Sequence, residues 1–124
     1  HALEELQRMG PPRVFEGVAT TTNATPTLIY RFGTASNVCY QFQVRVVARR
    51  TDVAGETASY ERTIHAKNIG GTVTVGATTA ISTFEDAAAW DVTVAVSGTD
   101  INVSVTGEAA KTISWKLNAR LDQV

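Results

Sequence analysis

His65 is the residue whose type and neighbours best fit acid–base or metal chemistry. It follows Glu61 and Thr63 at alternate positions, so the three side chains share one face of an extended segment. A histidine beside a carboxylate can act as a general base or as a metal ligand. However, the only other histidine is terminal, and no further Cys, His or Asp stands at the spacing of a zinc site. We therefore interpret His65 as a solvated strand residue, and expect no catalytic residue, no metal site and no cofactor.

A second group of residues could bind a ligand without transforming it. Glu85 and Asp86 form an acidic pair between Phe84 and Trp90. Carboxylates beside aromatic rings can bind calcium or a sugar, although adjacent acidic residues in a loop more often are solvated or cap a helical turn. A glycan-binding groove would also need exposed aromatic side chains beside polar ones. The aromatic candidates for such a groove are Tyr30, Tyr40, Tyr60 and Trp90.

The remaining charged and nucleophilic side chains fit structural roles. Arg49 and Arg50 could form a small anion-binding patch, but pairing with the nearby acids Asp52 and Glu56 is the simpler interpretation. Cys39 lies within an apolar alternation and is expected to be a small buried side chain rather than a reactive thiol. As the single cysteine, it excludes an intrachain disulfide.

The composition excludes two classes of partner. The 124 residues carry a formal net charge of -1, so there is no basic excess with which to neutralise phosphates, and we expect no nucleic-acid partner. No apolar run approaches the roughly 20 residues of a membrane-spanning helix, and we expect no membrane contact. A chain of this length suits one domain with one core.

Residues 1–12 are expected to form a connector. Leu3 and Leu6 recur at the spacing of one helical face, and Gly10-Pro-Pro12 then ends the helix because proline lacks a backbone donor. A helix this short is marginal in water. We therefore expect it to pack against another surface, with Leu3 and Leu6 as candidate contacts in an oligomer.

The apolar pattern changes to a period of two from residue 13 onward, which predicts β-strands. The clearest strand covers residues 38–49, and the most secure hairpin covers residues 91–105. The last strand, at 112–121, places Trp115 at the centre of the expected core. Short connections between such strands predict an all-β fold, an antiparallel β-sandwich or jelly-roll-like barrel of about seven or eight strands. We expect residues 13–124 to form this single domain.

Four short stretches, in this order, resemble a module found in structural proteins of tailed bacteriophages, often at the end of fibre-like or appendage proteins. The stretches are Val47-Ala-Arg-Arg-Thr-Asp52, Glu56-Thr-Ala-Ser-Tyr60, Phe84-Glu-Asp-Ala-Ala-Ala-Trp-Asp-Val92 and Val105-Thr-Gly-Glu-Ala-Ala-Lys-Thr-Ile-Ser-Trp115. The resemblance covers residues 36–124. It implies a virion component without an enzymatic role, commonly trimeric. The matched residues would then be architectural, with Gly107 forming a turn and Trp90 and Trp115 packing in the core.

Three functions follow as hypotheses. The leading one is a structural virion module (fibre, spike, decoration or adaptor) that assembles with copies of itself and with other virion proteins, a trimer being favoured. Val14 and Phe15, on a first strand that is not cleanly apolar on either face, are then candidate oligomer contacts. The alternative is a lectin-like module that recognises a host-surface glycan through Tyr30, Trp90, Glu85 and Asp86. The third is an enzyme, in which His65 with Glu61 or Asp52 would have to carry the reaction.

Overall fold

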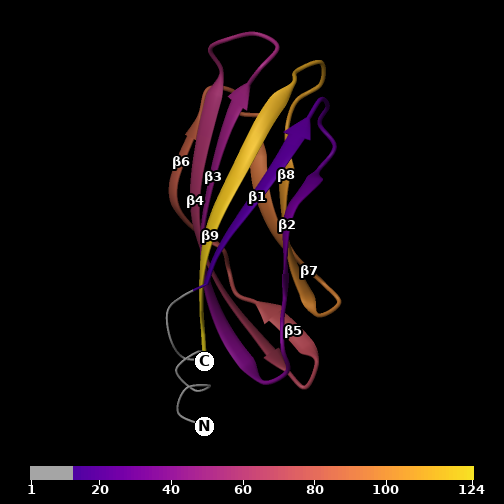
Figure 1. Ribbon diagram of the computed structural model, residues 1–124, viewed down its shortest axis with the longest axis vertical. Helices are drawn as coiled ribbons and strands as arrows, with labels where there is room; N and C mark the ends of the chain where they lie inside the picture. Colours follow the sequence, from indigo (N-terminus) through magenta and orange to yellow (C-terminus); the bar gives the residue numbers. More distant parts are fainter. Residues whose placement is uncertain (1–12) are drawn as a thin grey trace.

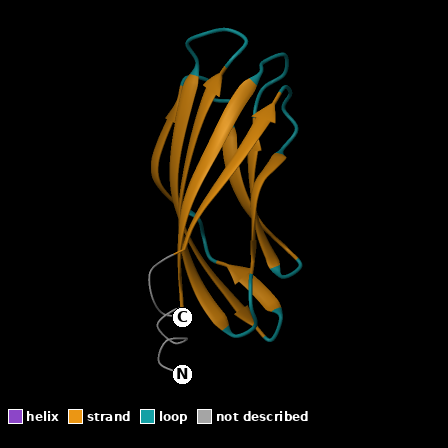
Figure 2. Ribbon diagram, in the orientation of Figure 1, coloured by secondary structure: helices purple, strands orange, loops and turns teal. Residues whose placement is uncertain are grey.

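Two antiparallel β-sheets make up the protein in a computed structural model, which describes residues 13–124 (Figures 1 and 2). The connector expected at residues 1–12, with Leu3 and Leu6, lies outside the described residues. No helix long and apolar enough to cross a membrane occurs between residues 13 and 124. The strands are β1 (Arg13–Thr21), β2 (Thr27–Gly33), β3 (Val38–Arg50), β4 (Thr57–Ile69), β5 (Thr72–Val75), β6 (Thr79–Glu85), β7 (Asp91–Ser97), β8 (Asp100–Thr106) and β9 (Ile113–Gln123).

The larger sheet has the order β1-β9-β3-β4-β5, with β6 also paired to β4, and the smaller has the order β2-β8-β7. The expected all-β sandwich is confirmed. Nine strands replace the seven or eight expected, because β5 and β6 are separate strands that pair with different ends of β4. Gly76 lies between them, and its backbone N–H donates to the carbonyl of His65.

Alternation along the long strands builds the core, as expected. On β3 the inward residues Phe42, Val44 and Val46 are each 1% exposed, while their neighbours Gln43 and Arg45 face solvent. Each fully buried aliphatic or phenylalanine side chain stabilises the fold by roughly 1.5–3 kcal/mol relative to exposure. The core residues on β9 show the same alternation and are Ile113, Trp115, Leu117, Ala119 and Leu121.

One flank of the sandwich is closed where β1 meets β2. Phe15, on the inward side of β1, packs against Tyr30 and Phe32 of β2, with ring centroids 5.3 and 5.6 Å apart. Phe32 in turn contacts Phe42 of the larger sheet at 4.5 Å. Phe15 is therefore engaged within its own chain, whereas Val14 points outward and is 70% exposed. Of the two oligomer contacts proposed on this strand, Val14 has the exposure that the role requires.

The expected β7–β8 hairpin is confirmed, with Val94 opposite Val103 and a turn at Gly98, whose φ of 62° is the left-handed value that glycine adopts without strain. A similar φ of 62° occurs at Ala110, in the loop between β8 and β9. An alanine in this conformation is strained by about 1–2 kcal/mol.

Replacing Ala110 by glycine is expected to stabilise the protein by about 0.5–1 kcal/mol, because the relief of strain exceeds the added entropy of the unfolded chain. Urea unfolding curves of the wild type and the variant measure the change. Ala109→Gly is the matched control: its φ is not positive, so the same substitution should destabilise the fold. An Ala110→Gly variant that loses as much stability as the control would contradict the left-handed conformation.

Candidate functional site

Charged residues from three of the matched stretches meet at one end of the sandwich, at the top of Figure 1, where the β3–β4 and β8–β9 loops lie. Arg50 Nε lies 2.8 Å from Asp52 Oδ1, and Arg50 Nη1 lies 2.8 Å from Glu56 Oε1. Lys111 Nζ lies 2.9 Å from the other oxygen of Glu56 and 3.0 Å from Glu108. We call these five residues the loop clamp.

Backbone hydrogen bonds join the same two loops. The Thr112 N–H donates to Asp52 Oδ1 at 3.2 Å, and the Thr51 N–H donates to the Thr112 carbonyl at 2.8 Å. The loop clamp therefore ties the start of β9 to the end of β3, which are neighbours in the sheet. The expected pairing of arginines with Asp52 and Glu56 is confirmed for Arg50, whereas Arg49 points to the opposite face and pairs with neither acid.

The charges of the loop clamp shift one another's protonation. The Arg50 guanidinium, which donates to Asp52, lowers the pKa of that carboxyl from 3.8 to about 2. The hydrogen bonds from Lys111 and then Arg50 lower the pKa of Glu56, and Glu56 and then Glu108 raise the pKa of Lys111. The Asp52 carboxyl binds its proton less readily in the folded state than in the unfolded state. Its contribution to the free energy of unfolding is therefore fully present above pH 3.8, and is lost as the pH falls toward 2.

Acid unfolding should therefore depend on Asp52. We expect Asp52→Asn to be less stable than the wild type at pH 7, and to lose less further stability than the wild type when the pH is lowered from about 4 to about 2. Urea unfolding at a series of pH values measures both effects. Asp122→Asn is the control, because Asp122 is exposed and 4.0 Å from Arg120, and it should leave the wild-type pH profile in place. Identical profiles for Asp52→Asn and the wild type would contradict the ion pair.

Aromatic residues of the matched stretches stack beneath the loop clamp. The centroid of the Trp115 ring lies 5.9 Å from that of Trp90 and 6.4 Å from that of Tyr60, and all three side chains are buried. Trp115 Nε1 donates to Thr21 Oγ1 at 2.9 Å. The packing roles expected for the two tryptophans are thus confirmed.

Gly107 has a different role from the one expected. Its φ is not positive, so turn geometry does not require glycine there. Instead, a Cβ at this position would lie 2.3 Å from Thr21 Oγ1 and 3.2 Å from the Asn23 carbonyl oxygen. Gly107 lies in the connection between β8 and β9, as expected, but glycine is needed there because the chain passes close to the Thr21 hydroxyl that accepts the Trp115 hydrogen bond.

Three of the four aromatic residues expected to face a glycan are buried. Trp90 is 1% exposed, and Tyr40 and Tyr60 are each 2% exposed, so the expectation of exposed rings at these positions was wrong. The reason is packing, since each of these rings fills the space between the two sheets. Tyr30 is half-buried and packs edge-on against Phe32, with centroids 4.6 Å apart.

The acidic pair of the expected glycan site has structural hydrogen bonds. Tyr60 Oη donates to Glu85 at 2.7 Å, and burial together with this bond raises the pKa of Tyr60. Asp86 Oδ2 accepts from the Thr57 N–H at 2.8 Å and from the Thr57 hydroxyl at 3.1 Å, at the start of β4. Both carboxylates thus anchor β6 to β4 in the larger sheet, whereas Tyr30 belongs to the smaller sheet.

His65 lies on the solvent face of β4, as expected, but apart from both carboxylates proposed to assist it. Glu61 pairs with Arg45 at 3.0 Å, and Asp52 belongs to the loop clamp. The imidazole of His65 lies beside a thiol instead, with Nδ1 4.0 Å from Cys39 Sγ. Cys39 is partly exposed, so the expectation that it is buried was wrong; Tyr40, its neighbour, takes the inward position. Among residues 13–124, no group of three His, Cys, Asp or Glu side chains could hold a metal ion.

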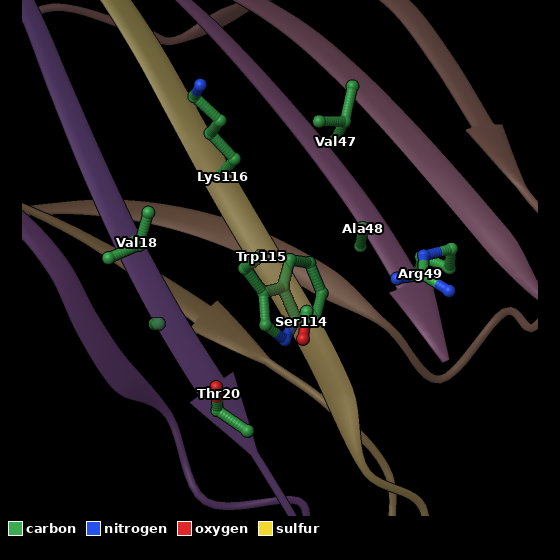
Figure 3. A pocket seen from close by; sticks show the side chains of 9 residues that line it. Val18, Thr20, Val47, Ala48, Arg49, Ser114, Trp115 and Lys116 are labelled. Atoms are coloured by element: carbon green, nitrogen blue, oxygen red, sulfur yellow. The ribbon is translucent and has the colours of Figure 1, made fainter. Parts of the chain in front are cut away.

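A shallow groove crosses the outer face of the larger sheet over β1, β9 and β3 (Figure 3). The exposed side chains of Val18 and Val47 flank Lys116, since Lys116 is opposite both residues in the sheet. Arg49 is the next residue of β3 after Val47 whose side chain is on this face. Within the described part of the chain, neither Arg49 nor Lys116 has an acidic partner within 4.0 Å. The hydroxyls of Thr20 and Ser114 complete the groove, which therefore offers two cations, an apolar strip and two hydroxyls.

No protein-family model matches this chain, and no curated protein matches it. Solved structures with a similar arrangement of strands include the tailspike of Acinetobacter baumannii phage AM24 (TM-score 0.45, 11% identity, 86% of this chain and 26% of that one). A second is the tailspike of Acinetobacter phage vB_ApiP_P1 (TM-score 0.44, 17% identity, 86% of this chain and 22% of that one). A third is the tailspike protein of A. baumannii phage Fri1, which is a capsular polysaccharide depolymerase (TM-score 0.48, 9% identity, 100% of this chain and 23% of that one). The chain thus spans about a quarter of each of these proteins.

Two features of the site were missed from sequence. Thr21, 3% exposed, has no sequence signal for its bond to Trp115, because 94 residues separate the partners. The groove joins strands from the two ends and the middle of the chain. The alternation of buried and exposed residues along β3 does predict that Val47 and Arg49 share one face. The positions of Val18 and Lys116 beside them depend on the pairing of β9 with both β1 and β3, which the sequence pattern does not reveal.

Proposed function

We propose that the chain is a non-enzymatic structural module of a tailed-phage virion, which assembles through contacts between β-domains, with a homotrimer favoured. The resemblance of the four matched stretches supports this role. Their charged residues form the loop clamp, and their aromatic residues form the buried stack around Trp115. These are architectural roles, which is what the resemblance implies for the matched residues.

The observation that carries the proposal is a row of exposed apolar side chains across the outer face of the larger sheet. Val18, Val47 and Phe84 are 75%, 53% and 56% exposed. The registers place them in one transverse row, in which Lys116 separates the two valines and Ser59 separates Val47 from Phe84. Exposed apolar side chains that recur in one row across a sheet, here alternating with Lys116 and Ser59, are a candidate surface for another protein to cover.

Light scattering coupled to size-exclusion chromatography tests the assembly. The 124-residue chain should elute as a stable homo-oligomer, with a trimer mass, over a wide range of concentrations. Cryo-electron microscopy of virions containing the parent polypeptide would then locate the module among its neighbours. A monodisperse monomer at the highest accessible concentration would count against the proposal.

The second candidate function is recognition of an acidic glycan, and the groove at Arg49 and Lys116 favours it. Cations without acidic partners can bind carboxylates, and the hydroxyls of Thr20 and Ser114 can bond to sugar oxygens. Binding of carboxylated and neutral oligosaccharides can be compared by calorimetry. The double variant Arg49→Gln/Lys116→Gln should lose the carboxylated ligand, while Arg120→Gln, on the same face of β9, should retain it. Equal binding by both variants would remove this candidate.

A further inference from the structure

Strand β6 is exposed on both of its faces. Every position from Thr79 to Phe84 is exposed, including Ala80 and Thr83, which lie opposite the inward-facing Arg62 and Tyr60 of β4. β6 makes its extensive contacts with β4 alone and pairs with no other strand of the described chain. The backbone groups along its outer edge are therefore left without partners from residues 13–124.

The other long edge of the larger sheet is protected. β1 packs against β2, and a Cβ at Gly17 would lie only 2.5 Å from the Ile29 carbonyl oxygen, so these two edges cover each other. Arg13 and Glu16 add charges along β1, and Pro26 precedes β2. Proteins use such coverage, charges and prolines to prevent strand edges from pairing with other chains. β6 has less protection: its only charge is Glu85 at its end, and Thr79-Ala-Ile-Ser-Thr-Phe84 contains no charge and no proline.

A second edge belongs to β7, at the end of the smaller sheet, where β7 pairs only with β8 and contacts β5 at a few positions. β7 begins with the charged Asp91, but its stretch Val92-Thr-Val-Ala-Val-Ser97 lacks charge and proline, and Val96 is 41% exposed although the buried Val92 lies on the same face. β6 and β7 are each seven residues long. One molecule thus presents two free strand edges of equal length and similar chemistry.

We propose that β6 of one copy pairs with β7 of the next copy, so that backbone hydrogen bonds join the larger sheet of one protomer to the smaller sheet of its neighbour. An extended strand of another chain can pair with a whole row of free N–H and C=O groups, and an uncharged strand fits a surface made of Thr, Ala, Ile and Phe. Because the two edges differ, the contact is head-to-tail, and it generates a closed ring when the rotation between copies closes. This inference rests on the proposed self-assembly and adds to the outer-face row of Val18, Val47 and Phe84 a second contact, through strand edges.

Hydrogen exchange on the full chain, measured by mass spectrometry across a dilution series, tests this pairing. Amides of both 79–84 and 92–97 should exchange at least about tenfold more slowly in the oligomer than in the diluted monomer. Protection of 79–84 without 92–97 would overturn the proposal in favour of β6 pairing with its own copy. An oligomer in which neither segment gains protection would overturn this inference and leave the proposed assembly intact, whereas a chain that never assembles would count against both.

Substitutions locate the contact independently. Ile81 is 57% exposed on β6 and Ala95 is exposed on β7, so lysine at either position should leave the fold intact and shift the protein toward monomer. Val53→Lys is the control, because Val53 is 54% exposed in the β3–β4 loop, away from both edges. Circular dichroism checks that each variant is folded. Dissociation by Val47→Lys, with Ile81→Lys and Ala95→Lys still assembled, would overturn the edge pairing and assign the contact to the outer face.

Discussion

Replacing Gly17 by alanine is expected to lower the free energy of unfolding by roughly 1–3 kcal/mol, the usual cost of overpacking a well-packed region. An added Cβ would lie 2.5 Å from the carbonyl oxygen of Ile29 and 3.4 Å from its carbonyl carbon. Both are backbone atoms, so neither can move away by a change of rotamer. β1 would have to separate from β2, and the contacts of Phe15 with Tyr30 and Phe32 would weaken with it.

Gly33→Ala is the matched control for this substitution. Gly33 is also a strand glycine without a positive φ, and its added Cβ would meet only Asp100 Oδ1, at an ordinary 3.6 Å. Its stability should stay within about 0.5 kcal/mol of the wild type. Urea unfolding of the two variants measures the difference. If Gly17→Ala proved as stable as Gly33→Ala, the backbones of β1 and β2 would not be in contact.

The strands could be predicted because burial imposes a period of two on each of them separately. Tyr40, Phe42 and Val44 alternate with glutamines, and that signal requires no knowledge of the rest of the fold. The β7–β8 hairpin was equally accessible, since its two strands are adjacent in sequence. By contrast, the pairing of β9 with β1 and β3 joins residues that are 63 to 108 positions apart, and alternation does not specify the partner of a strand.

The candidate site was harder to predict because aromatic residues serve both binding and packing. Trp90 sits between an acidic loop and a strand, a position compatible with an exposed ring, yet it is buried against Trp115. Glu85 and Asp86 looked available because their hydrogen-bond partners, Tyr60 and Thr57, are more than twenty residues away. The fate of Arg49 and Arg50 was decided by alternation: the sheet turns them to opposite faces, so one joins the loop clamp and the other remains exposed.

Replacing Trp115 by phenylalanine is expected to destabilise the protein by roughly 2–4 kcal/mol. The smaller ring leaves a cavity between Trp90 and Tyr60, which the stacked aromatic residues cannot fill. It also removes the indole N–H that donates to Thr21 Oγ1 at 2.9 Å. Thr21 is 3% exposed, so its hydroxyl cannot turn to water instead. Leaving a buried polar group without its partner costs about 1–3 kcal/mol.

Trp90→Phe separates the two contributions. Trp90 is buried as deeply as Trp115, but its Nε1 has no hydrogen-bond partner within residues 13–124. The substitution therefore removes ring volume without breaking a hydrogen bond, and it should cost about 1–3 kcal/mol less than Trp115→Phe. A double-mutant cycle between Trp115→Phe and Thr21→Val measures the same bond directly, with a coupling of about 1 kcal/mol expected. Additive losses in the cycle, with equal costs for the two tryptophan variants, would show that the hydrogen bond between Trp115 and Thr21 adds nothing to the packing of the indole ring.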